Sequence, residues 1–197
     1  MKLSLILATN NRHKVDEIKD VLAGLEIDIH TLDEFPEIPE VIEDGDTLEA
    51  NALKKAREIY ASTGILSLAD DTGLEVDCIG GQPGVYSSRF SGENATYESN
   101  TSKLLTMLKN VPWDKRSAQF RCVMAIVGEE VERTLEGVCR GYILEENRGR
   151  AGFGYDPIFY VPEYNQTFAE MPLSLKNLIS HRGIALQKVK QFFQNTT

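Results

Sequence analysis

The chain has 197 residues, 42% of them hydrophobic, which is enough to bury a sizeable core in a single domain spanning residues 1–197. Lys and Arg total 21 against 30 Asp and Glu, and a net charge of -9 argues against a surface that binds nucleic acid. No apolar stretch is long enough for a membrane span or a signal peptide. Three cysteines without disulfide or metal spacing (Cys78, Cys122 and Cys139) are expected to be buried thiols in a reducing compartment. We therefore expect a cytoplasmic protein without nucleic-acid or membrane partners.

The first segment, TNNRHK at 9–14, follows an apolar run at 3–7 that predicts a buried strand. Apolar residues then recur at helical spacing over 15–22, so 9–14 is a turn from strand to helix. Such a turn directs backbone N–H groups and the positive end of the helix dipole at one place, which suits an anion. The alternative is that Thr9 or Asn10 simply caps the helix.

An acidic loop is predicted over 33–46, after a second strand at 26–31. The loop holds seven carboxylates and no basic residue, and its two prolines disfavour regular structure. Residues 47–62 predict a helix that stops at Gly64.

A buried strand predicted at 65–69 ends on Asp70 and Asp71. Adjacent carboxylates at a strand end lie where open α/β sheets bind ligands, and their hard oxygens suit Mg²⁺. Glu43 of the acidic loop is a candidate for a further ligand. The alternative is an Asx turn, in which the aspartate only satisfies nearby backbone groups.

The second half of the chain predicts a helix at 97–108, two long strands at 118–127 and 131–142 joined by a hairpin, and a final helix at 183–193. Early alternation of strands and helices followed by a hairpin indicates an α/β fold with a mixed sheet.

Two polar clusters follow the hairpin. Glycines at 149, 152 and 154 let backbone and aromatic faces approach a flat ligand in the FGYDP segment at 153–157, although a turn with core aromatics has the same pattern. The SHRG segment at 180–183, preceded by Lys176 and Asn177, is a second candidate anion or carbonyl site. The alternative for His181 is a helix cap or a surface position.

The common nucleotide-binding and hydrolase motifs are missing: the sequence contains no GxxxxGK[ST], GxGxxG, HExxH or GxSxG. The residues by themselves therefore indicate a Mg-dependent α/β protein whose ligand combines phosphates with a flat ring.

Seven segments taken in order resemble the inosine triphosphate pyrophosphatase family, the non-canonical purine NTP diphosphatases. They are TNNRHK, VIEDGDTLEANA, ADDTGL, GGQPGVYSSRFSG, GFGYDPIF, TFAEM and KNLISHRG. The resemblance implies a two-lobed α/β fold on a long mixed β-sheet flanked by helices, an active-site cleft between the lobes, Mg²⁺ dependence and a homodimer. It implies hydrolysis of ITP, dITP or XTP to the monophosphate and pyrophosphate, which cleanses the nucleotide pool.

The resemblance also implies roles for individual residues. Glu43 and Asp71 would carry the metal, and Asp71 would be the general base on the attacking water. The triphosphate would be bound by Thr9, Asn10, Asn11, Arg12, His13 and Lys14. The other substrate contacts would be Thr72, the base-pocket residues Phe153, Gly154, Tyr155 and Asp156, and Lys176, His181 and Arg182.

Three positions depart from the family pattern. Thr72 stands where Ser is common, Ala50 where Glu is common, and Ala151 where Gly is common. Glu49 would replace the carboxylate missing at Ala50 only if the helix presents it inward. Two other classes stay open: a nucleotidyltransferase with the same Mg-triphosphate geometry, and a non-catalytic nucleotide sensor.

Overall fold

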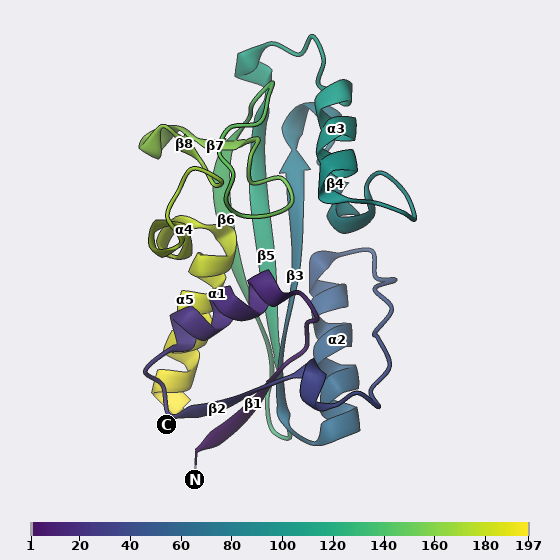
Figure 1. Ribbon diagram of the computed structural model, residues 1–197. Helices are drawn as coiled ribbons and strands as arrows, with labels where there is room; N and C mark the ends of the chain where they lie inside the picture. Colours follow the sequence, from purple (N-terminus) through teal and green to yellow (C-terminus); the bar gives the residue numbers. More distant parts are fainter. Residues whose placement is uncertain (1, 197) are drawn as a thin grey trace. The chain divides into compact units, whose positions relative to one another are not determined.

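The computed structural model describes residues 2–196 and has a mixed α/β fold, as predicted (Figure 1). Within these residues eight strands form one sheet in the order β2-β1-β3-β5-β6-β7-β8, with β4 paired to β3 off this path. The strands are β1 (Leu3–Leu7), β2 (Ile27–Thr31), β3 (Leu66–Val76), β4 (Pro83–Gly84), β5 (Ser117–Val127), β6 (Glu132–Ile143), β7 (Phe159–Val161) and β8 (Gln166–Thr167). The α-helices are α1 (Arg12–Leu22), α2 (Leu48–Thr63), α3 (Tyr97–Met107), α4 (Leu173–Ile179) and α5 (His181–Thr196). The first of several short 3-10 helices is η1 (Leu32–Glu34), at the start of the acidic loop.

Strand β3 is longer than predicted, and the expectation that it ends on Asp70 and Asp71 is wrong. Its parallel pairing with β1 does stop early, with Leu7 opposite Leu68. The strand nevertheless continues, because Leu74 is fully buried in a second core and pairs with β4. Asp70 and Asp71 therefore lie inside β3, just beyond the last residue that pairs with β1.

Most of the predicted long elements are confirmed within a residue or two. Helix α2 ends as expected, because Gly64 adopts a left-handed conformation with φ of 66°. Helix α5 begins at His181 instead of Gly183. The patterns missed α4 and the strands β4, β7 and β8, which are too short for periodicity to be visible.

The chain divides into two compact units. Unit 1 comprises residues 1–71, 122–137 and 181–197, and unit 2 comprises 72–121 and 138–180. Each unit has its own apolar core, and β3, β5 and β6 contribute residues to both units. Each is described below by itself.

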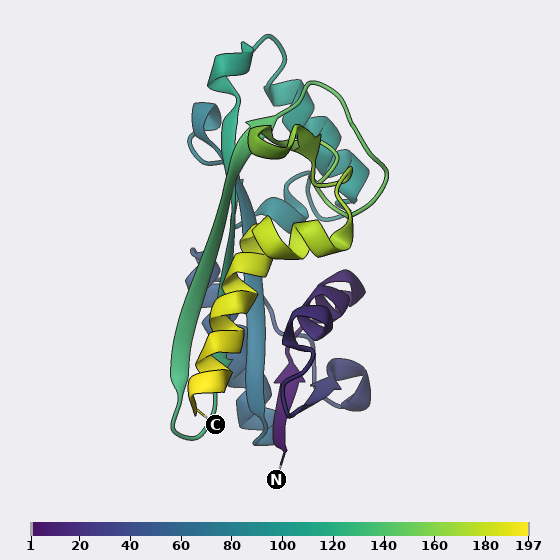
Figure 2. The ribbon, with the colours of Figure 1, turned by 90° about the vertical axis from the view of Figure 1, so that its left-hand side faces the viewer.

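In unit 1, helices α1 and α5 lie side by side on one face of the strands, and α2 covers the other face (Figures 1 and 2). The alternation of β1 explains both layers. Leu5 and Leu7 pack with residues of α1 and α5 in one core cluster, whereas the fully buried Ile6 points to the opposite face. Because the strand is buried on both faces, its apolar run is continuous.

In unit 2, helix α3 contributes Leu104 to the core, and Leu108, the residue that caps its C-terminus, joins the same cluster; both are fully buried. Three aromatic rings pack together in this core. The ring centroid of Phe159 lies 4.7 Å from that of Phe120 and 4.9 Å from that of Phe168. This core supports the loop between β6 and β7, which carries the FGYDP segment.

The cysteines are free, and the expectation of burial is confirmed for Cys122 and Cys139 but wrong for Cys78, which is exposed. Cys78 lies in a 3-10 turn after β3, where sequence composition gives no periodic burial signal. Among the described residues, every helix is too short or too polar to cross a membrane.

Candidate active site

The turn before α1 is a capped helix start. The Asn11 side chain accepts hydrogen bonds from the backbone N–H groups of His13 (3.1 Å) and Lys14 (3.4 Å), and Thr9 Oγ1 accepts from Asn11 N (3.2 Å). Asn11 is therefore the cap, and not Thr9 or Asn10, which the alternative interpretation of this turn names. Asn10, Arg12 and His13 are exposed, and Lys14 is half-buried in the first helical turn. An anion at this turn stays a prediction.

A buried ionic network lies behind this turn in unit 1. Lys14 Nζ lies 3.0 Å from Asp70 Oδ2, and the Arg182 guanidinium donates to the same oxygen from Nε and Nη2, both at 3.4 Å. Arg182 Nη1 also donates to Glu17 Oε2 at 2.6 Å. Burial alone would raise the pKa of Asp70, but the charges of Lys14, Arg182 and Lys55 outweigh it and hold this pKa well below its usual range.

Asp71 has the opposite electrostatic character to its neighbour. Burial has the largest effect and raises the pKa of Asp71, and the charge of Glu43 raises it further. Lys55, Asn51 and Lys14 act in the opposite direction without reversing the shift. Lys55 binds the Glu43 carboxylate and donates to the backbone carbonyl of Asp70 at 2.6 Å. Two adjacent carboxylates thus have pKa values displaced in opposite directions, a pattern that separates a permanently charged group from a proton acceptor.

The donor set of Glu43 and Asp71 fits Mg²⁺. Both offer hard carboxylate oxygens, and the influence of the Glu43 charge on Asp71 shows mutual repulsion that a divalent cation would relieve. The described residues contain no group of three or more His, Cys, Asp or Glu able to hold a metal. Mg²⁺ usually takes only one or two carboxylates and completes its shell with water and phosphate oxygens.

His181 is buried and begins α5, close to strand β6. Gly137 of β6 makes the approach possible, since a Cβ there would collide with the backbone carbonyl of His181 and the backbone nitrogen of Ala185. The burial of His181 excludes the surface alternative. Its expected contact with substrate stays a prediction.

The FGYDP loop of unit 2 is held by Asp156. Its Oδ2 accepts hydrogen bonds from Phe153 N (2.9 Å) and from Lys176 Nζ (2.7 Å), and that ammonium lies 4.8 Å from the Phe153 ring centroid. A Cβ at Gly152 would strike the Asp156 carboxylate. Tyr155 is buried and donates its hydroxyl to Ser87 O (3.0 Å), so it anchors the loop to the core.

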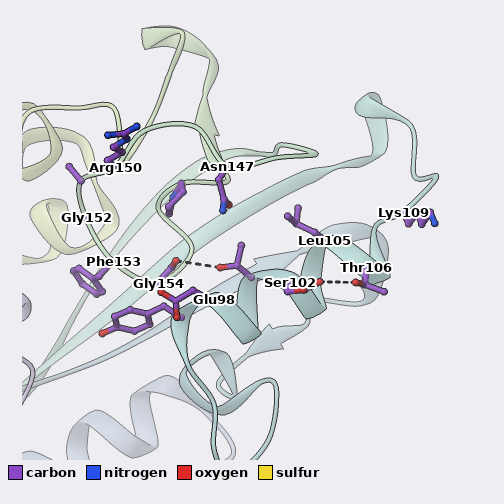
Figure 3. A pocket seen from close by; sticks show the side chains of 14 residues that line it. Glu98, Ser102, Leu105, Thr106, Lys109, Asn147, Arg150, Gly152, Phe153 and Gly154 are labelled. Atoms are coloured by element: carbon purple, nitrogen blue, oxygen red, sulfur yellow. Dashed lines mark hydrogen bonds between the residues drawn. The ribbon is translucent and has the colours of Figure 1, made fainter.

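A pocket of about 600 Å³ lies between this loop and α3 in unit 2 (Figure 3). Phe153 and Gly154 are at one end and Lys109 is at the other, while Thr101 donates to Gly154 O at 3.5 Å. Its volume is typical of small-molecule pockets. Of the four predicted base-pocket residues, Phe153 and Gly154 line it, whereas Tyr155 and Asp156 are buried supports.

Sequence reasoning missed Asn51, Lys55 and Glu17, all of which are buried. A signal was present, because Asn51 and Lys55 interrupt the apolar stripe of α2 at helical spacing. Glu49 does not replace the carboxylate absent at Ala50, because it is exposed and accepts a hydrogen bond from Thr134 (3.3 Å). Thr72 follows Asp71 in β3 and is half-buried.

Comparison with known proteins identifies relatives over nearly the full length of this chain. The chain is 52% identical over 190 residues to a dITP/XTP pyrophosphatase of Desulforamulus reducens, covering 96% of this chain and 94% of that protein. It is 50% identical over 187 residues to a dITP/XTP pyrophosphatase of Geobacter sulfurreducens, with 94% of each covered.

Solved structures are similar as well. A HAM1 protein from Coxiella burnetii superposes with a TM-score of 0.91 at 40% identity over 98% of this chain and 99% of that one. The Ham1 protein of Staphylococcus aureus gives 0.89 at 35% identity, over 98% of this chain and 100% of the other. The Ham1 family model matches residues 5–192, so the chain belongs to the Ham1 family.

Proposed function

We propose that this protein is a nucleoside triphosphate diphosphatase that hydrolyses dITP, ITP and XTP to the monophosphate and pyrophosphate with Mg²⁺. The observation that carries the proposal is the identity of about half of all residues, over nearly the full chain, with dITP/XTP pyrophosphatases. The cluster around Asp71 supports it, because it combines carboxylates for a cation with lysines for phosphates.

In this proposal the residues of unit 1 would carry out the chemistry. Lys14 would bind a phosphate oxygen, and its ammonium is already oriented by Asp70. Asp71 would accept a proton from the attacking water, a role that suits a carboxylate with a raised pKa. Mg²⁺, held by Glu43 and Asp71, would supply charge stabilisation on the phosphates. Water attacks the α-phosphorus, the bond to the bridging oxygen breaks, and pyrophosphate leaves.

In this proposal the residues of unit 2 would contact the purine. Phe153 offers an aromatic face, and Lys176 lies above that ring in a cation–π arrangement. A 6-oxo purine presents an acceptor at O6 and a donor at N1, the reverse of adenine. Protein groups that donate hydrogen bonds to O6 would therefore have no acceptor when ATP is bound. Each buried donor left unpaired in this way would weaken binding by about 1 to 3 kcal/mol.

The decisive experiment is incubation of the protein with Mg²⁺ and each of dITP, ITP, XTP, dGTP, GTP and ATP, followed by separation of the products. We expect monophosphate and pyrophosphate in equal amounts from the first three nucleotides. Release of inorganic phosphate with a diphosphate left behind would refute the proposal. Transfer of the nucleotidyl group to an added acceptor would favour the nucleotidyltransferase, and absence of turnover would favour the sensor.

Mg²⁺ dependence is tested in the same assay with excess chelator, which should abolish turnover until Mg²⁺ is restored. The homodimer and the cytoplasmic location stay predictions. Light scattering after size-exclusion chromatography measures the first of these.

A further inference from the structure

Asn51 joins the two carboxylate-bearing segments of unit 1. It is fully buried in α2, and both ends of its side-chain amide are used. Nδ2 donates to Asp71 Oδ2 at 3.0 Å, and Oδ1 accepts from Gly45 N at 2.8 Å. One planar amide therefore connects the middle of β3 to the acidic loop.

The loop is fixed by α2 at three successive residues. Lys55 binds Glu43, Lys54 binds Asp44 at 2.7 Å, and Asn51 binds Gly45. The Lys54 pair is largely exposed, so it contributes little to the position of the loop. Asn51 is neutral, unlike both lysines, and it donates directly to the Asp71 carboxylate.

Gly45 is fitted closely to this amide. A Cβ at Gly45 would lie 2.7 Å from Asn51 Oδ1 and 3.0 Å from the Ala50 Cβ. Backbone and amide can approach to hydrogen-bond distance only because no side chain intervenes. This contact fixes the position of the backbone at Gly45, two residues after Glu43.

We propose that Asn51 is a positioning residue that fixes the placement of Glu43 relative to Asp71 for the divalent cation. A bond to Oδ2 restricts rotation of the Asp71 carboxylate, while the bond to Gly45 holds the segment that carries Glu43. An amide does this without adding charge to the metal site, unlike a lysine or a further carboxylate. The inference rests on the metal ligands assigned under the proposed function.

The test measures binding of Mn²⁺ alone, by electron paramagnetic resonance without nucleotide, to the full-length protein and its Asn51→Ala variant. Partners that orient metal ligands typically contribute tenfold or more to metal affinity, so we expect Mn²⁺ to bind about tenfold more weakly to the variant. Gly45→Ala should give a similar loss, because it disturbs the same contact with Asn51 intact. It also provides the test if Asn51→Ala fails to fold.

Asn100→Ala is the matched control. Asn100 is also a buried helix asparagine, in unit 2, whose Oδ1 accepts from Ser91 N (2.7 Å) and whose Nδ2 donates to Ser88 O (3.0 Å). It should lower the melting temperature as Asn51→Ala does, yet leave Mn²⁺ affinity unchanged. Asn51→Ala should also lower kcat for dITP hydrolysis, and a higher Mg²⁺ concentration should restore part of this loss.

The proposal is overturned if Asn51→Ala is folded and binds Mn²⁺ as tightly as the wild-type protein. It is also overturned if the wild-type protein does not bind Mn²⁺ at millimolar concentration. Asn51 is proposed to hold Glu43 and Asp71 in place before any nucleotide binds, so the metal alone should bind. Failure of the proposed function is a separate result: a protein that binds Mn²⁺ through Asn51 but leaves dITP intact keeps the inference and loses the activity.

Discussion

The Lys14 ammonium lies 3.0 Å from Oδ2 of Asp70, whose carboxylate has no solvent-exposed surface. Asp70 is thereby held in a cationic network with Lys14 and Arg182, whereas burial raises the pKa of the next carboxylate along the strand, Asp71. Side chains of adjacent strand residues point to opposite faces, which explains how neighbours acquire such different surroundings.

Asp70 should make stability sensitive to acid. Its pKa in the folded protein lies below the unfolded value of about 4. Its ion pairs therefore stabilise the fold above about pH 4, and this contribution is lost as the pH falls from there towards the folded pKa. The difference in unfolding free energy between wild type and Asp70→Asn, measured by urea denaturation, should be largest at neutral pH and shrink in acid. A pH-independent difference would contradict this.

Asp71→Asn should retain the fold and lower kcat for dITP by about a hundredfold or more, because a general base contributes about that much. Steady-state kinetics at saturating Mg²⁺ measures the loss, and circular dichroism checks the fold. Asp114→Asn, at an exposed carboxylate of unit 2, is the control and should behave as wild type. Near-normal turnover of folded Asp71→Asn would remove Asp71 from the role.

Lys14→Ala should raise KM for dITP about tenfold with a smaller change in kcat, because a phosphate contact made in both ground and transition states affects binding uniformly. Lys19→Ala, at an exposed position of the same helix, is the matched control. If KM for dITP is the same in both variants, Lys14 does not contact the triphosphate.

Arg182→Ala should lower the free energy of unfolding by about 3 kcal/mol, because it leaves two buried carboxylates, Asp70 and Glu17, without their shared cation. Urea denaturation at pH 7 measures the loss. A folded variant of wild-type stability would show that the buried pairs contribute nothing. The ratio of kcat/KM for ITP to kcat/KM for ATP, measured in the same variant, tests whether Arg182 also discriminates between the two purine bases.

Alkylation should distinguish the exposed thiol of Cys78 from the buried thiol of Cys139. Cys78 is exposed, whereas burial, together with the charge of Glu163, raises the pKa of Cys139 to about 12. Since the thiolate is the nucleophile, iodoacetamide at pH 8 should modify Cys78 first and leave Cys139 intact while the protein is folded. Peptide mass mapping after brief exposure identifies the site. Equal modification of Cys78 and Cys139 would show that Cys139 is not protected.

Local sequence patterns were sufficient to predict the α/β class, most of the long helices and strands, and the segments that carry the family resemblance. These follow from local patterns: apolar periodicity over ten or more residues, a helix stop at Gly64, and prolines in the acidic loop. Glu43 and Asp71 could be predicted as candidate metal ligands because carboxylate oxygens are hard ligands that suit Mg²⁺.

The surroundings of Glu43 and Asp71 could not be predicted in the same way, because they depend on contacts between distant parts of the chain. Continuation of β3 past Asp71 depends on a core formed with distant segments, and the opposite pKa displacements of Asp70 and Asp71 depend on Lys14, Arg182 and Lys55. The role of Asn51 depends on partners 6 and 20 residues away along the chain. A local pattern records which side chains share a face, but electrostatics and hydrogen bonding are set by groups that folding brings together.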